Sequence, residues 1–150
     1  MIKNLFKKKL SNEIQLNEQQ NKDKIINIMA LLIEASSIDG YIDEKETIRI
    51  IEIISKYFNS DINIIQRYYK EALSQKEENS SFYTFTSKIN KEYNYNEKIQ
   101  ILEMLWEIIL IDGKQHDFES NLMRRVSGLL YIKDIDSGKA RKKVINTIKK

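Results

Sequence analysis

Apolar residues recur along most of this chain at intervals of three and four, which places them on one face of an α-helix. The segment beginning at Asp43 shows this spacing in Ile48, Ile51, Ile54 and Phe58. Many of these residues are β-branched, as in strands, but they do not alternate strictly with polar residues. The run is also longer than an ordinary strand. The pattern therefore predicts helices rather than a sheet.

Turn residues and polar stretches divide this pattern into separate helices. Asp43 and Asn94 each precede a glutamate by three residues, the spacing of a capping box at a helix start. Ser60 is predicted to cap the helix that follows Phe58, and the polar stretch 76–80 to join two halves of the chain. The predicted helices cover about 17–37, 43–58, 60–75, 81–93, 94–112, 116–130 and 134–147.

An acidic pattern occurs twice, with an offset of 73 residues. Its first copy contains Glu34, Asp39-Gly40 and Glu46, and its second contains Glu107, Asp112-Gly113 and Glu119. Each copy is predicted to be a helical hairpin, in which the glycine permits a positive φ just past the end of the first helix. Self-similarity of this kind indicates two related helical halves, at about 17–76 and 81–150.

The three carboxylates of each copy should converge on the turn between the two helices. Clustered carboxylates repel one another unless a positive charge lies among them, and hard divalent cations take oxygen ligands of this type. An equally simple interpretation needs no metal, because acidic residues at a helix N-terminus cap free N–H groups and complement the dipole. The candidate metal ligands are Glu34, Asp39, Asp43, Glu46, Glu107, Asp112, His116 and Glu119.

The two copies are chemically unequal, because His116 stands in the second copy where the first has Asp43. A histidine nitrogen would favour Zn²⁺ or another transition metal, although a histidine at a helix start also serves as a cap or surface residue. Neither copy is an EF-hand, since Ala35 in the first copy and Ile108 in the second stand where the first ligand of that loop would be. The metal's identity stays open.

Composition removes several classes of protein. The chain has 150 residues, no cysteine and no proline, which excludes disulfides and cysteine-based zinc sites and disfavours turn-rich β folds. Residues 1–9 and 139–150 carry ten basic residues and no acid, so with an overall charge of +3 the body between them has a net charge of −7. An acidic body is a poor nucleic-acid reader, and it suits cations or a protein partner.

The N-terminal residues 1–16 are predicted to be a basic amphipathic helix preceding the main domain. Ile2, Leu5, Phe6 and Leu10 recur at helical spacing among lysines. Such a helix either packs on the domain or lies on an anionic membrane, giving peripheral contact through residues 1–10. Because no apolar stretch is long enough for a span or a signal peptide, we expect a cytoplasmic protein.

Other side chains are better explained by packing or solvation than by chemistry. Glu97 and Glu103 are expected on a solvated helix face, and Arg124 and Arg125 to pair with acids or form a basic spot. Without a basic surround, the aromatic residues are expected to pack in the core or between the two halves rather than to offer a stacking platform. These aromatic residues are Tyr68, Tyr69, Phe82, Tyr83, Phe85, Tyr93 and Tyr95.

The paired acidic hairpins resemble those of the TerB family, named for tellurite resistance. The segment Leu105-Trp106-Glu107, with Asp112-Gly113, His116, Glu119, Leu122, Arg124-Arg125 and Leu129-Leu130, resembles the most recognisable block of stand-alone bacterial members. Phe82-Tyr83-Thr84-Phe85 resembles their aromatic segment, and the resemblance covers about residues 20–145. It implies an all-α bundle, an acidic metal-binding surface, roles in chemical stress and no established enzyme activity.

We therefore expect a single-domain all-α bundle of about seven to eight helices. Its expected function is that of a non-enzymatic TerB-like module that binds Ca²⁺, Mg²⁺, Mn²⁺ or Zn²⁺ at its acidic turns and modulates contact with another protein. The alternative is a metal-free interaction scaffold. Its acids would act only as helix caps, and its exposed face would dock another protein or a membrane-bound complex. A metal-dependent hydrolase is disfavoured, because the sequence offers no oriented general base, nucleophile elbow or phosphate loop.

Overall fold

The computed structural model describes residues 21–36, 42–78, 82–111 and 117–148. Within these ranges the chain forms helices and no strand, which confirms the predicted all-α bundle. Residues 21–36 are helical and are followed by α2 (Glu44–Phe58), α3 (Ile62–Glu78), α4 (Phe82–Glu92), α5 (Tyr95–Ile111), α6 (Asp117–Leu129) and α7 (Asp134–Ile148).

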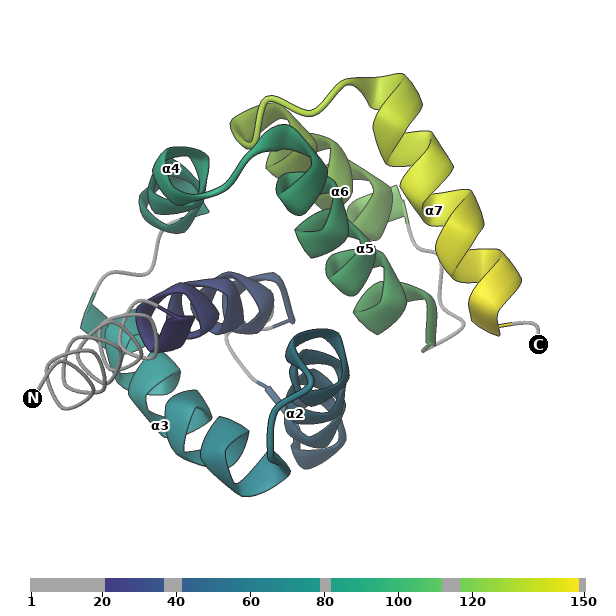
Figure 1. Ribbon diagram of the computed structural model, residues 1–150. Helices are drawn as coiled ribbons and strands as arrows, with labels where there is room; N and C mark the ends of the chain where they lie inside the picture. Colours follow the sequence, from purple (N-terminus) through teal and green to yellow (C-terminus); the bar gives the residue numbers. More distant parts are fainter. Residues whose placement is uncertain (1–20, 37–41, 79–81, 112–116, 149–150) are drawn as a thin grey trace, which may run out of the picture.

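Two helices form the centre of the bundle, the 21–36 helix and α5. Nine consecutive residues, 25–33, are buried, including Asn27, so this helix is covered on every side. Helix α5 is similarly apolar, as expected for a helix enclosed by its neighbours. In Figure 1, α2 and α3 lie near the 21–36 helix, whereas α6 and α7 lie beside α5.

The contact between α2 and α5 joins the two groups of helices. Helix α5 also packs along α7, while α4 packs against α6. Buried side chains from both groups belong to one continuous hydrophobic core. This arrangement places polar residues of α2, α5 and α7 around one small cavity, although they are far apart in the sequence.

Helix caps agree with the predicted capping signals in two places. Asp43 Oδ1 accepts from the backbone N–H of Glu46 at 2.7 Å and begins α2. At the start of α5, Asn94 Oδ1 accepts from the N–H of Glu97, and Glu97 Oε1 accepts from the N–H of Asn94, each at 2.9 Å. The second arrangement is a complete capping box.

Other boundaries differ from those predicted. Asp61, rather than Ser60, caps α3, because the Ser60 N–H completes the C-terminal turn of α2 and the helix starts one residue later. Residues 76–78 extend α3, so the predicted loop at 76–80 is wrong for that part. Ile48 was predicted on the apolar face of α2 but is 48% exposed, because Ile50, Ile51, Ile53 and Ile54 are the residues that face the core.

The predicted N-terminal helix over 1–16 lies outside the described residues, so its packing or membrane contact stays a prediction. Among the helices of the described ranges, none combines the length and apolar character needed to cross a membrane.

Candidate functional site

The first acidic corner is defined here by Glu34, Asp43 and Glu46, which flank the segment 37–41. Glu34 is half-buried in the last turn of the 21–36 helix, and its Oε2 atom is buried with no hydrogen-bond partner among the described residues. The C-terminal end of a helix carries partial negative charge, so the helix itself disfavours a carboxylate there. Glu34 therefore offers an oxygen that the described protein groups do not satisfy.

The other two carboxylates of this corner lie at the start of α2, where the helix dipole favours them. Asp43 uses Oδ1 for the cap, and its backbone carbonyl accepts from both the N–H and the hydroxyl of Thr47, each at 3.1 Å. The Thr47 hydroxyl also lies 2.9 Å from the Tyr69 hydroxyl on α3. Burial raises the pKa of Tyr69, and the negative charge of Glu46 raises it further.

The second acidic group that the structure describes lies on α5, where Glu103 and Glu107 are one turn apart. The Lys56 Nζ of α2 is 3.5 Å from Glu107 Oε1, and the Lys143 Nζ of α7 is 3.3 Å from Glu103 Oε1. The carboxylates are largely buried, with side chains 15% and 7% exposed for Glu107 and Glu103, whereas both lysines are mostly exposed. Two ion pairs therefore connect α5 to α2 and α7.

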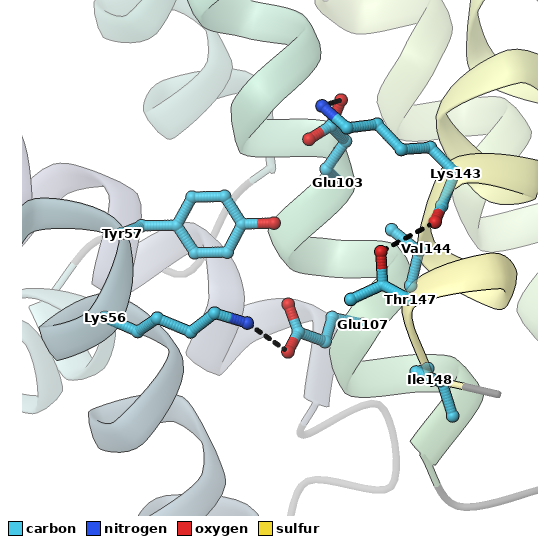
Figure 2. Close-up of a pocket in the computed structure, with 8 residues that line it drawn as sticks. All are labelled: Lys56, Tyr57, Glu103, Glu107, Lys143, Val144, Thr147 and Ile148. Atoms are coloured by element: carbon cyan, nitrogen blue, oxygen red, sulfur yellow. Dashed lines mark hydrogen bonds and ion pairs between the residues drawn. The ribbon is translucent and has the colours of Figure 1, made fainter. Parts of the chain in front are cut away.

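A cavity of about 40 Å³ lies between these pairs. Figure 2 shows the Tyr57 hydroxyl directed toward the space between Glu103 and Glu107. Burial, followed by the negative charges of Glu107 and Glu103, raises the pKa of Tyr57 to about 12. Because a ligand pocket usually encloses at least about 300 Å³, this cavity has room for a small ion or water and not for an organic substrate.

The predicted metal ligands that lie in the described ranges are not gathered into one site there. Glu34, Asp43, Glu46 and Glu107 are described there, and no group of three or more acidic or histidine side chains is gathered for a metal in these ranges. Glu107 belongs to the ion pair with Lys56 on α2. Asp39, Asp112, His116 and the side chain of Glu119 lie outside the described residues, so the complete predicted corners stay predictions.

The described donor atoms nevertheless differ in how well they suit a hard cation. Asp43 and Glu107 each have one carboxylate oxygen engaged by a protein group, whereas the buried Oε2 of Glu34 is unsatisfied. Carboxylate oxygens are the ligands that Ca²⁺ and Mg²⁺ prefer. The first corner therefore fits such an ion better than the described part of the second.

Sequence reasoning misplaced Glu103, which was expected on a solvated face and is 6% exposed. Its neighbours Ile101, Leu102, Met104 and Leu105 are also buried, so this stretch of α5 has no wide polar face. An uninterrupted apolar surround was the signal that could have predicted a buried glutamate needing a cation. The partner lysines were not predictable, because they come from helices distant in the sequence.

One family model matches this chain when it is compared with known proteins. The model described as "Tellurite resistance protein TerB" matches residues 25–142, which is most of the chain. No curated protein and no solved structure gives a significant match.

Proposed function

The chain belongs to the TerB family, and we propose that it is a non-enzymatic module of that family that binds a divalent metal ion at its first acidic corner. The observation that carries this proposal is the buried Oε2 of Glu34, which has no hydrogen-bond partner among the described residues. A bound cation would neutralise this carboxylate and the acids at the start of α2. When bound, the metal would supply positive charge between the end of the 21–36 helix and the start of α2.

A role in the response to tellurite or other chemical stress follows only from membership in the family. The ion-binding corner would act by changing a surface that contacts another protein in the cytoplasm. The buried acids of α5 are held in ion pairs around a cavity too small for an organic substrate, which argues against a reaction at that cluster.

The experiment is calorimetric titration of the full chain with Ca²⁺, Mg²⁺, Mn²⁺ and Zn²⁺, each compared with the Glu34→Gln variant. Wild type should bind one or more of these ions, and Glu34→Gln should weaken binding at least about tenfold, because a charged oxygen ligand is lost. Glu52→Gln is the matched control. Glu52 is exposed on α2, so this substitution removes the same charge outside the corner. Equal heats for wild type and Glu34→Gln would contradict the proposal.

A second candidate, a metal-free interaction scaffold, has its own support in the described contacts. Asp43 serves as a helix cap, and Glu103 and Glu107 pair with lysines, so these acids have structural roles without a metal. On this alternative, the melting temperature should be the same with divalent ions and with a chelator. A metal-dependent rise that Glu34→Gln abolishes would favour the metal-binding module instead.

A further inference from the structure

A groove of about 320 Å³ lies between α4 and the corner that links α6 to α7, away from the acidic corners. Two exposed tyrosines line it, Tyr83 on α4 and Tyr131 just after α6, with 70% and 76% of their surface exposed. The sequence predicts that Tyr83 is packed against other residues, and its exposure contradicts that prediction. The other lining residues are Thr86, Ser87, Asn90, Lys91, Gly128 and Leu129.

Tyr131 adopts an uncommon backbone conformation. Its φ of 56° lies in the left-handed region, which an aromatic residue rarely adopts. The Ile132 N–H donates to the Ser127 carbonyl and the Tyr131 N–H to that of Gly128, which is the Schellman arrangement that usually contains glycine at this position. Helix α2 ends in the same way at Asn59, a residue type that tolerates this conformation. An exposed tyrosine is therefore present where glycine or asparagine would be less strained.

Gly128 is a second position where this groove departs from what the fold alone favours. It lies in the last turn of α6, and a Cβ atom there would meet nothing within 4 Å. No close contact therefore requires glycine, although alanine is the better helix former. Because Gly128 has no side chain, the space at this position of the groove is open.

The charged side chain among the residues that line the groove is a lysine. Lys91 lines the groove, which no carboxylate lines among the described residues. Lys98 lies behind it, 9% exposed, and its Nζ donates to the Leu130 carbonyl at 2.7 Å and to Asn90 Oδ1 at 3.2 Å. Both acceptors are neutral, and within the described part of the chain no carboxylate pairs with this buried amine. The Lys98 Nζ also lies 5.8 Å from the centre of the Tyr131 ring, so Lys91 is the lysine that an anionic group on a ligand would complement.

We propose that this groove binds an acidic, proline-containing segment of a partner protein in the extended polyproline II conformation. Two exposed tyrosines along the groove suit proline rings, and the Ser87 hydroxyl and Lys91 amine are donors for the free carbonyls of such a segment. A strand would need a sheet edge, which the described helices do not offer. Residues 1–150 contain no proline, so such a segment lies outside them.

The test is NMR titration of the full chain with an acetylated, amidated peptide containing three Glu-Pro-Pro repeats. We expect saturable shifts at Tyr83, Ser87 and Tyr131. A peptide with lysine in place of glutamate, and one of Glu-Gly-Ser repeats, should each bind at least about tenfold more weakly, because charge or preformed conformation is lost. No shift at the groove with millimolar peptide, or equal binding of the Glu-Gly-Ser peptide, would overturn the proposal.

Variants separate binding from folding. Tyr131→Gly should leave Tm unchanged or raise it by about 2–4 °C, since it relieves the left-handed backbone, while weakening the peptide at least about tenfold. Asn59→Gly is the matched control at the equivalent end of α2, and peptide binding should be unchanged. Unchanged binding by Tyr131→Gly would contradict the proposal, as would tighter binding of single-stranded oligothymidylate than of the peptide. Peptide binding to this groove requires no divalent ion. Its success or failure can therefore be judged separately from the metal-binding proposal.

Discussion

Glu34 and Glu107 are 73 residues apart in the acidic pattern, and each lies near the C-terminal end of a central helix. Their surroundings nevertheless differ. Glu34 has a buried oxygen without a hydrogen-bond partner among the described residues, whereas Glu107 pairs with Lys56 of α2. Similar sequence positions therefore present one carboxylate that is suited to an added cation and another that already has a protein cation.

This comparison shows that a repeated acidic pattern does not by itself define two equal sites. On α5, the lysines of neighbouring helices supply the positive charge that buried carboxylates need. At the first corner, the described groups engage Asp43 as a cap and leave Glu34 Oε2 unsatisfied. The predictions that follow test this difference.

The largest effect is expected from charge reversal of the buried acid on α5. Glu103→Lys would place a third cation near Lys143 and Lys56, lowering the free energy of unfolding by about 3 kcal/mol. Urea denaturation measures this change. Adding Lys143→Glu should recover part of the loss by restoring an opposite-charge pair, and no recovery would show that the pair is not the cause.

A smaller loss is expected when the cap of the first corner is removed. Asp43→Ala should lower the free energy of unfolding by about 1 kcal/mol, because the Glu46 N–H loses its acceptor. Asp43→Asn retains a capping oxygen and should remain within a few tenths of wild type. Thermal or urea unfolding in the presence of chelator separates this role from metal binding, and equal losses in both variants would argue against the cap.

Removing the charge of each compared glutamate should have opposite effects in the absence of divalent ions. Glu34→Gln is expected to raise the free energy of unfolding by about 1 kcal/mol, because it removes a partly buried charge from a helix C-terminus. Glu107→Gln should lower it by about 0.5 kcal/mol, because the pair with the exposed Lys56 is lost. Urea unfolding of both variants in the presence of chelator measures the two changes in the free energy of unfolding. Changes of the same sign in both variants would contradict this prediction.

The smallest effect concerns the pH dependence contributed by Tyr57. Its pKa is raised to about 12 in the folded state, so the stabilisation is complete below the unfolded value of about 10 and is lost as pH rises toward 12. Tyr57→Phe should reduce the fall in stability between pH 9 and pH 11. We expect a difference below about 1 kcal/mol for this half-buried side chain, measured from urea midpoints. Identical slopes for the two proteins would contradict this expectation.

The helical class, most helix positions and the capping box formed by Asn94 and Glu97 could be predicted from the sequence. These features depend on residues three or four positions apart, so their physical cause is contained in a short segment. The TerB resemblance was also visible in the sequence, and the family model confirms it. The metal ligands remain predictions.

Which charges are buried, and which groups neutralise them, could not be predicted in this way, because both depend on how the helices pack. Glu103 is enclosed because α5 packs against α2 and α7, and its lysine partner is 40 residues away in the sequence. The burial of Lys98, whose amine donates to the Leu130 carbonyl and to Asn90 Oδ1, likewise depends on how α4 and α5 meet the end of α6. Burial and charge pairing are properties of several helices together, whereas helix formation and capping are mainly properties of one.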